Sequence, residues 1–363
     1  MQAGPTNTLV DVAGIAVGHH DRIGPGWLTG TTVVLAPPGT TGGVVVGGGG
    51  AGVGDLAPLD PTGLVPTVDA VVLSGGSAYG LAAADGVRAW LARRRRGYRV
   101  GPEAHHVVPI VPAAILFDLG RGGRFGNRPT AAFGRAAAAA ATTEAVPQGN
   151  VGAGAGAVAG GLKGGIGSAS VVLDSGVTVA ALVAVNSAGS VLDPATGRLW
   201  GSDRGLPGEF ALGRPRAADV RAWRDRPHVA QPLNTTLAVV ATDADLSKPE
   251  ATRLAAAAHD GMARAIDPIH LYVDGDVAFG LATGAIPLAA EGDETYRGAR
   301  NRPALVGQVC AAGADAVARA IVHAVLAAAT TGPWISYRDR FPNAVRAPLA
   351  GGASPRRRTR RAR

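Results

Sequence analysis

Cysteine, aromatic and charged residues are all scarce in this sequence. The single cysteine among 363 residues, Cys310, excludes an internal disulfide and a metal site built from several cysteines. Aromatic residues make up 4% and charged residues 17% of the chain, whereas hydrophobic residues reach 47% and glycine numbers 54. This composition predicts a globular protein whose core is built from small side chains with closely packed backbones.

Long hydrophobic runs and targeting signals are also missing. No stretch of about 18 uninterrupted apolar residues occurs, so no transmembrane helix is predicted. The segment Met1–Asn7 has no basic region followed by an apolar one, so we expect no signal peptide. These absences predict a cytoplasmic protein without a membrane partner.

Positive charge is modest outside the C-terminal end. The formal net charge is +8, but six arginines lie between Arg356 and Arg363. The rest of the chain carries only about +2, which is ordinary for an enzyme. We therefore expect a disordered basic tail over residues 346–363 and no specific nucleic-acid partner.

Neither of the two Gly-rich segments fits a nucleotide site. Gly47–Gly54 is not followed by the Gly-Lys-Ser/Thr of a P-loop. Residues 149–167 lack a clear preceding strand and a suitably placed acidic residue. The adjacent pairs His19-His20 and His105-His106 point in different directions and make poor chelates. We therefore predict no cofactor and no metal.

Apolar, β-branched runs alternate with segments of helical composition, which predicts an α/β fold. Because most strand-like runs are apolar on both faces, we expect helices outside two stacked sheets, in one domain over residues 1–345. The expected strands are Leu9–Val17, Thr31–Ala36, Ala70–Leu73, Val107–Val111, Ala114–Phe117, Ala169–Leu173, Val177–Asn186, Leu237–Asp243 and Val277–Thr283. The expected helices are Leu81–Arg95, Thr130–Thr143, Arg214–Arg224, one started by the capping box Ser247–Glu250, and Leu305–Ala329 with the polar stripe Asp315, Arg319 and His323.

The triplet Asn234-Thr235-Thr236 stands directly ahead of a buried strand. Residues 225–234 before it form a polar, Pro-containing linker of the kind that is readily cut. Cleavage between Asn234 and Thr235 would give Thr235 a hydroxyl and an α-amine, as in N-terminal-nucleophile hydrolases. A hydroxyl-rich loop before a strand is the plainer interpretation of the triplet alone.

Other segments, in their order along the chain, carry a family resemblance. Together they resemble the L-aminopeptidase/D-esterase family, which includes β-peptidyl aminopeptidases and the nylon-oligomer hydrolase. The similarity covers about residues 7–345. The matching segments are Ser74–Leu81, Val111–Asp118, Gly149–Gly154, Lys163–Gly165, Val185-Asn186, Asn234–Thr236, His259–His270 and Asp274–Phe279.

The resemblance implies a four-layer αββα sandwich and self-processing into chains 1–234 and 235–363. It implies that Thr235 is the nucleophile, where the aminopeptidases have Ser and the nylon-oligomer branch has Thr. It also implies a homo-oligomer, a tetramer. The other implied site residues are Asn186 for the oxyanion or substrate amide, Tyr79 for the substrate, Lys163 near the nucleophile, and Asp274 and Asp276.

Elementary chemistry agrees with these roles. An α-amine titrates near pH 8, so it accepts the Thr235 proton far better than a lysine at neutral pH. The Asn186 amide could donate a hydrogen bond to the oxyanion. Lys163 is the only charge in its Gly-rich neighbourhood, and we expect Asp274 or Asp276 to be its partner. At these two positions the aminopeptidases have Ser and Glu, whereas the nylon-oligomer enzyme has two Asp.

The sequence thus predicts a self-processed N-terminal-threonine amidohydrolase or aminopeptidase that acts on small peptides or amides. Two other functions remain open at this point. One is an acyltransferase of the ornithine acetyltransferase type, which passes the acyl group to an amine rather than to water. The other is an unprocessed relative that only binds a ligand.

Overall fold

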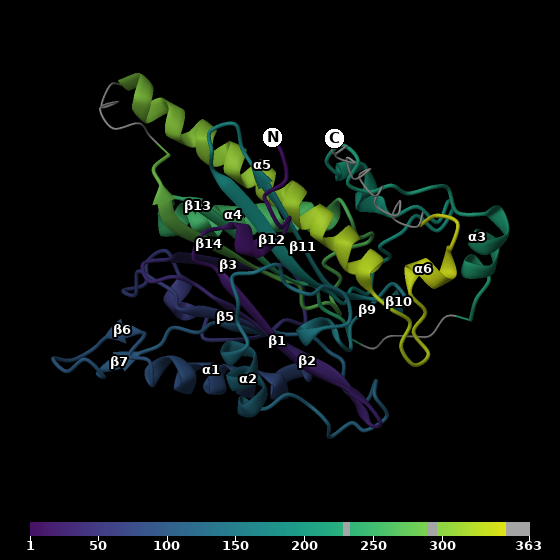
Figure 1. The fold of residues 1–363 in the computed structure, drawn as a ribbon, viewed down its shortest axis with the longest axis horizontal. Coiled ribbons are helices and arrows are strands. Elements are labelled where there is room, and N and C mark those ends of the chain that lie inside the picture. Colours follow the sequence, from purple (N-terminus) through teal and green to yellow (C-terminus); the bar gives the residue numbers. More distant parts are fainter. Residues whose placement is uncertain (228–232, 289–295, 346–363) are drawn as a thin grey trace, which may run out of the picture.

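The computed structural model describes residues 1–227, 233–288 and 296–345. The predicted basic tail 346–363 and part of the linker before Thr235 lie outside these residues. The described chain forms two five-stranded sheets, one from the N-terminal part and one that draws on both parts of the sequence (Figure 1).

The first sheet has the strand order β1-β2-β5-β8-β4. Its neighbours are antiparallel except for β5 and β8, which run parallel. The strands are β1 (Ala16–Gly24), β2 (Trp27–Leu35), β4 (Gly52–Gly54), β5 (Ala70–Ser74) and β8 (Ala113–Ile115).

The second sheet has the order β11-β12-β13-β14-β3. Only β13 and β14 run parallel in it. The strands are β3 (Thr41–Val46), β11 (Gly165–Val172), β12 (Thr178–Val185), β13 (Leu237–Ala244) and β14 (Val277–Ile286). All eight residues of both β12 and β13 are buried, as expected from their continuous apolar runs.

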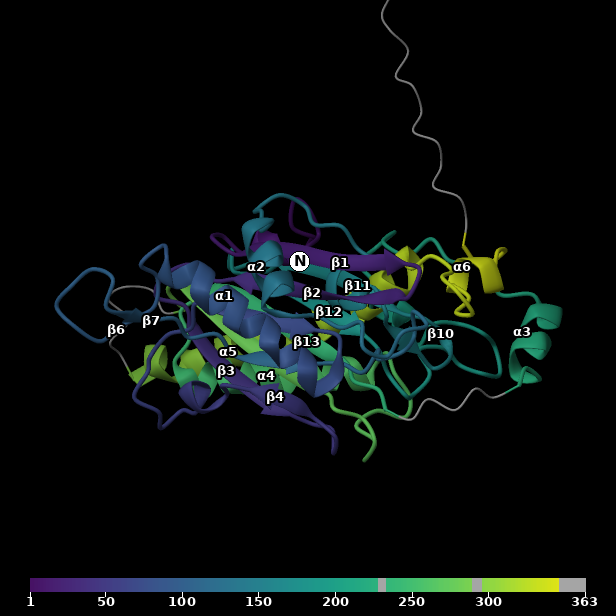
Figure 2. The same ribbon diagram turned by 90° about the horizontal axis from the view of Figure 1, so that it is seen from below.

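Three apolar clusters separate four layers. The central cluster joins the inner faces of both sheets and includes Leu73, Leu182 and Phe279. A second packs the first sheet on α1 (Ala82–Ala92) and α2 (Ala131–Ala139). A third packs the other sheet on α4 (Lys248–Ala263) and α5 (Tyr296–Ala327). The predicted αββα sandwich is therefore confirmed, with one helix pair at each outer face (Figures 1 and 2).

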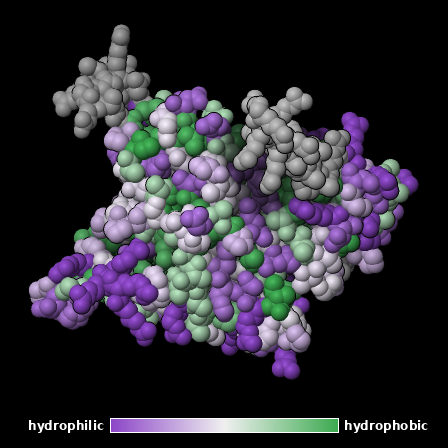
Figure 3. Space-filling view, viewed as in Figure 1, coloured by the Kyte–Doolittle hydropathy of each residue, from purple (hydrophilic) through white to green (hydrophobic). Residues whose placement is uncertain are grey.

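Smaller elements extend the sandwich at its ends. The hairpin β6 (Tyr98–Arg99) and β7 (Val107–Val108) follows the arginine-rich end of α1, and hydrophilic residues gather there at the lower left of Figure 3. Short helices α3 (Ala217–Arg224) and α6 (Tyr337–Arg340) lie together at the opposite end (Figure 1). The hairpin β9 (Val158–Ala159) and β10 (Leu162–Lys163) precedes β11.

The predicted strand Leu9–Val17 is wrong over most of its length. Leu9–Asp11 forms a 3-10 turn, and strand β1 begins only at Ala16. The turn forms because Thr8 and Asp11 make a reciprocal capping box that satisfies backbone N–H groups locally. The capping box at Ser247 and Glu250 was predicted correctly and starts α4.

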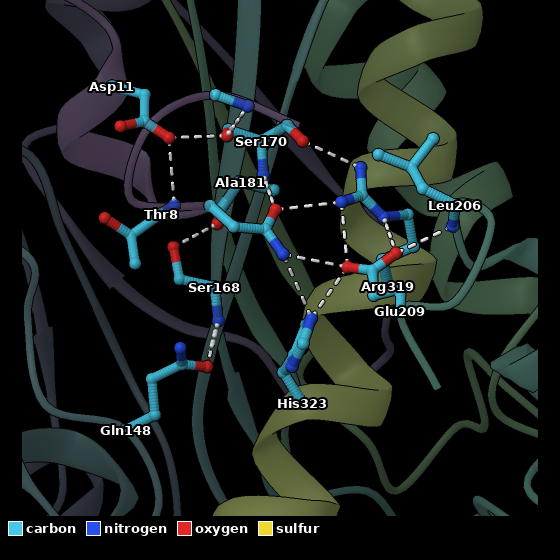
Figure 4. A network of polar contacts seen from close by, with 12 residues as sticks. Thr8, Asp11, Gln148, Ser168, Ser170, Ala181, Leu206, Glu209, Arg319 and His323 are labelled. Atoms are coloured by element: carbon cyan, nitrogen blue, oxygen red, sulfur yellow. Dashed lines mark hydrogen bonds and ion pairs between the residues drawn. The ribbon is translucent and has the colours of Figure 1, made fainter. Parts of the chain in front are cut away.

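The longest helix, α5, packs on the second sheet. Its segment Arg302–Ala327 is long and apolar enough to cross a membrane by length and composition, but 78% of its most apolar window is buried inside the protein. The predicted polar stripe of Asp315, Arg319 and His323 forms hydrogen bonds and ion pairs with other elements. Arg319 donates to both carboxylate oxygens of Glu209, at 2.7 and 2.8 Å, and His323 lies 2.8 Å from the same carboxylate (Figure 4).

Candidate active site

At one end of the second sheet, the termini of its five strands lie side by side. The register places Gly165 opposite Val185, Ala184 opposite Leu237, and Val277 opposite both Leu237 and Val46. The residues just outside these positions therefore come together in space. They are Lys163 before β11, Asn186 after β12, Thr235 before β13, Asp274–Asp276 before β14 and Gly47–Gly50 after β3.

Thr235 is buried at this end of the sheet, with 3% of its surface exposed. Its backbone N–H donates to the carbonyl oxygen of Asn186 at 2.7 Å. Its hydroxyl donates to the carbonyl oxygen of Asn234, the residue before it. The same Asn234 oxygen accepts the N–H of Gly275 at 3.2 Å. The carbonyl oxygen of the peptide bond between Asn234 and Thr235 thus accepts hydrogen bonds from both a hydroxyl and a backbone N–H.

Asp276 holds the strand that Thr235 opens. One carboxylate oxygen accepts the N–H of Thr236 at 2.7 Å. The other accepts the N–H of His270 at 3.2 Å and lies 2.9 Å from its Nδ1. The second nitrogen of His270 lies 3.2 Å from His259 Nδ1, which sequence reasoning did not place at the site. A fully buried carboxylate is thereby fixed on three sides.

Asp274 is fully buried but sparsely bonded. Its Oδ1 accepts the N–H of Ala188 at 3.3 Å, and its Oδ2 has no hydrogen-bond partner among the described residues. Burial, assisted by the charge of Asp276, raises the pKa of Asp274 to about 7. This carboxyl can therefore exchange a proton near neutral pH.

The Gly-rich segment after β3 packs its backbone against the Asp274–Asp276 turn. The N–H of Gly47 donates to the Asp276 carbonyl at 2.8 Å, and that of Gly50 donates to the Asp274 carbonyl at 2.7 Å. A Cβ at Gly48 would lie 2.3 Å from the carbonyl oxygen of Asp274. Gly48 thus permits a close backbone contact that any larger residue would prevent.

Asn186 uses its side-chain oxygen twice. Oδ1 accepts the N–H of Val158 at 3.0 Å and a short hydrogen bond from the Arg121 guanidinium. Its NH₂ group contacts the Phe117 carbonyl at 3.4 Å, a long hydrogen bond. Because two donors meet at Oδ1, the amide is held with its NH₂ group directed away from them.

Lys163 is fully buried, but the expectation of an Asp274 or Asp276 partner is wrong. Its ammonium group donates to the carbonyl oxygens of Gly154, Ala157 and Gly164 at 2.8–3.0 Å. The three carbonyls accept all three ammonium protons, although those of Gly154 and Ala157 also accept backbone N–H groups. Burial and the nearby Arg121 charge lower the pKa of Lys163 to about 7, which Asp118 opposes.

Sequence reasoning missed Asp118 and Arg121 as site residues. Burial raises the pKa of Asp118 to about 6, although the Gly76 N–H donates to it at 2.7 Å. Burial lowers the pKa of Arg121 to about 10, so the guanidinium stays charged at neutral pH. Both residues lie just after β8, which runs parallel to β5. Charged residues directly after a buried parallel strand were the available signal.

Tyr79 takes no part in the contacts just described. It lies in the 3-10 helix Ser77–Leu81 after β5, and 53% of its surface is exposed. The Arg128 guanidinium carbon stacks 3.6 Å from the centre of its ring. The ring is not joined to Thr235 by hydrogen bonds that the structure describes, and the expected contact of Tyr79 with the substrate stays a prediction.

Comparisons with known proteins identify the family of this chain. The profile of peptidase family S58 matches residues 7–334. An uncharacterized aminopeptidase of Mycobacterium tuberculosis is 49% identical over 348 residues, which cover 93% of this chain and 99% of the relative. The 6-aminohexanoate-oligomer endohydrolase of Kocuria sp. is 32% identical over 293 residues, which cover 77% of this chain and 75% of that enzyme.

Solved structures show the same fold. A β-aminopeptidase from Burkholderia sp. has a TM-score of 0.65 at 26% identity and covers 93% of this chain and 92% of its own. The L-aminopeptidase D-Ala-esterase/amidase from Ochrobactrum anthropi, described as a variant of the Ntn hydrolase fold, has a TM-score of 0.67 at 21% identity, with 93% of each chain covered. This chain therefore belongs to peptidase family S58 and is a hydrolase of the aminopeptidase and amidase type with the Ntn hydrolase fold.

Proposed function

We propose that this S58 hydrolase cuts its own chain between Asn234 and Thr235 and then uses Thr235 to hydrolyse small peptides or amides. One observation carries the proposal: the Thr235 hydroxyl contacts the carbonyl group of Asn234 while the Gly275 N–H donates to the same oxygen. A nucleophile and an oxyanion donor thus meet at one peptide bond.

Self-cleavage begins when Thr235 Oγ1 attacks the carbonyl carbon of Asn234. The negative charge develops on the oxygen that already accepts the Gly275 N–H at 3.2 Å. The C–N bond then breaks, an ester forms on Oγ1, and the hydroxyl proton passes to the departing nitrogen. Asp274, which titrates near neutral pH, is the proposed carrier of that proton. Water hydrolyses the ester and leaves Asn234 as a new C-terminus.

The new α-amine of Thr235 becomes the base for later substrates. Its nitrogen already donates to the Asn186 carbonyl at 2.7 Å, and this contact would hold the amine beside its own hydroxyl. An α-amine has a pKa near 8, so it takes up the hydroxyl proton near neutral pH. Asp276 positions the strand through the Thr236 N–H, and buried Lys163 lies just before β11 at the same end of the sheet.

The relatives indicate the substrate class. One relative is named an aminopeptidase, and another is named an endohydrolase of 6-aminohexanoate oligomers, so both names denote amide hydrolysis. We propose small peptides or amides as substrates of this chain. Tyr79, exposed on the 3-10 helix after β5, is the proposed contact for the leaving part of the substrate.

An isosteric pair of variants tests the nucleophile. Thr235→Val removes the hydroxyl and should abolish both self-cleavage and amidase activity. Thr236→Val removes the next hydroxyl, which is buried and has no hydrogen-bond partner in the described part of the chain, and should leave both intact. Denaturing gels and N-terminal sequencing report cleavage, and the expected fragment begins Thr-Thr-Leu-Ala-Val-Val. Release of 4-nitroaniline from amino-acid nitroanilides reports hydrolysis.

The proposal fails if the Thr235→Val protein still yields that fragment or retains hydrolysis. It also fails if the unaltered protein stays a single chain and hydrolyses none of the nitroanilides.

A further inference from the structure

The Arg121 guanidinium contacts both Asn186 and the side chain of Asn234. One guanidinium nitrogen donates to the Gly156 carbonyl at 2.7 Å and to Asn186 Oδ1. The other donates to Asn234 Oδ1 at 3.1 Å. The first two contacts do not involve Asn234, so they fix the guanidinium before and after any cut at this residue.

The Asn234 side chain is enclosed at this position. Only 2% of the residue is exposed, and its Nδ2 is buried without a hydrogen-bond partner among the described residues. The pocket therefore offers a hydrogen-bond donor to the amide oxygen, but the described residues offer no acceptor to the amide nitrogen. A buried donor without an acceptor is unfavourable, which marks the oxygen as the recognised feature.

In the proposed self-cleavage, Asn234 supplies the acyl group that is transferred to Thr235. This inference therefore rests on the proposed function. The ester formed on Thr235 Oγ1 has the same bond as an acyl-enzyme formed from a substrate. Once Asn234 departs, Arg121 loses that acceptor. A substrate acyl group that presents an oxygen at the same place would restore the hydrogen bond.

We infer that Arg121 is a specificity-determining residue that selects acyl groups bearing an oxygen on the fourth carbon, counted from the scissile carbonyl carbon. Asparaginyl and aspartyl amides have this oxygen, as a carboxamide and a carboxylate. A carboxylate would also replace the unmatched nitrogen by an oxygen, which removes the buried donor that lacks an acceptor.

Charge in the pocket adds a second element of selectivity. Arg121 donates to the Gly156 carbonyl, and Lys163 donates to the carbonyls of Gly154 and Ala157 in the same loop. The Arg121 guanidinium would repel a cationic substrate group there, and burial of that group would be costly. Lysyl amides should therefore be poorer substrates than leucyl amides, whose side chain is apolar.

Three nearly isosteric substrates test the inference with the unaltered, self-processed protein. We would measure kcat/KM for the L-asparaginyl, α-L-aspartyl and L-leucyl 4-nitroanilides. Either oxygen-bearing substrate should exceed the leucyl one by about 10-fold or more, as expected for a hydrogen bond to a charged donor. The asparaginyl and aspartyl values separate the carboxamide from the carboxylate. A leucyl value equal to or above both would overturn the inference.

Variants assign the preference to Arg121. Arg121→Met keeps much of the volume and removes the donors, so the ratio of the preferred substrate to the leucyl substrate should fall about 10- to 100-fold. Arg121→Lys keeps the charge without the fork and should retain part of the ratio. Arg124→Met, an exposed arginine in the same loop, should leave the ratio unchanged. An unchanged ratio in Arg121→Met would refute the assignment.

The precursor supplies an independent readout. Asn234→Leu should slow self-cleavage in the Arg121 protein but have little further effect in Arg121→Met, as a double-mutant cycle would show. Equal slowing in both backgrounds counts against the inference. If the unaltered protein neither cuts itself nor hydrolyses any nitroanilide, the proposed function fails instead, so the two failures are distinct.

Discussion

Because Gly275 has no side chain, Thr235, the proposed nucleophile, can lie close to the Asp274–Asp276 turn. A Cβ added there would lie 2.7 Å from Thr235 Oγ1 and 2.9 Å from the Gly50 carbonyl oxygen. Real Cβ atoms do not come so close to oxygen atoms, and one of these neighbours is backbone. Gly275 therefore combines two tasks: it leaves space for the hydroxyl, and its N–H donates to the Asn234 carbonyl.

Gly275→Ala should displace the Thr235 hydroxyl and lengthen the hydrogen bond to the Asn234 carbonyl oxygen. We expect self-cleavage to slow by about 10²–10³-fold, the usual effect of losing an oxyanion donor. Time-resolved denaturing gels of the purified precursor measure the rate. Gly307→Ala on α5, where an added Cβ meets no atom within 4 Å, is the control and should cleave at the normal rate. Normal cleavage by Gly275→Ala would refute this role.

At the scale of single residues, the sequence identified most of the site but not its contacts. Thr235 could be singled out because it stands directly ahead of an apolar strand, whereas Asn186 and Asp274–Asp276 were implied by the family resemblance. The partner of Lys163 could not, because the ammonium group is satisfied by carbonyls of a non-repetitive backbone path. Arg121 was missed because the loop after β8 belongs to the other sheet, and only sheet stacking brings it to Asn186.

At the scale of elements, a buried ion pair ties α5 to the rest of the sandwich. The side chains of Arg319 and Glu209 are 2% and 7% exposed, and Arg319 also donates to Asn7 and to the Ser170 carbonyl (Figure 4). Burial alone raises the pKa of Glu209, but hydrogen bonds from His323, Arg319 and Asn7 outweigh it and bring the pKa well below its ordinary value. The proposed cut would place Glu209 and Arg319 on different chains.

Glu209→Gln should lower the free energy of unfolding by about 3–5 kcal/mol, because it leaves a buried guanidinium without its counter-charge. The folded-state pKa of Glu209 lies below its unfolded value near 4.5, so the stabilisation is present above that pH and is lost on further acidification. The unaltered protein and the variant should therefore converge in stability in acid. Denaturant titrations of both proteins across pH measure this.

Glu250→Gln provides the matched control. Glu250 also pairs with an arginine, Arg302, but the two side chains are 23% and 31% exposed. Glutamine still completes the capping box with Ser247. The expected loss is about 1 kcal/mol or less, as for surface pairs. Equal losses in the two variants would show that burial does not set the strength of the Glu209 pair.

The elements themselves differ in how far the sequence determined them. Helices with clear caps, such as α4, and strands buried on both faces, such as β12, could be located from composition alone. Leu9–Asp11 could not, because a local capping box overrides the strand preference of its apolar residues. Strand order was beyond prediction, since β3 pairs with β14 across more than two hundred residues of sequence.

At the scale of the whole molecule, the proposed cut would leave two interleaved chains. Strands β13 and β14 would belong to residues 235–363, yet β13 pairs with β12 and β14 pairs with β3, both from residues 1–234. Separating the chains requires breaking two strand ladders and the central apolar cluster. The fragments should therefore stay associated without a covalent link.

After cleavage, both fragments should elute together from a size-exclusion column and separate only in denaturant. Elution of fragment 235–363 at its own mass in native buffer would contradict the interleaved arrangement. Light scattering on the same column gives the mass of the assembly and tests the tetramer that the family resemblance implies.

The interleaved second sheet would also set the timing of the proposed cut during synthesis on the ribosome. When residues 1–234 have been made, the strands that flank the later pair already exist, but the two places between them are empty. The donor N–H of Gly275 is made still later, just ahead of β14. The proposed cut would have to wait until β14 is inserted, so activity would be released only after this part of the second sheet has folded.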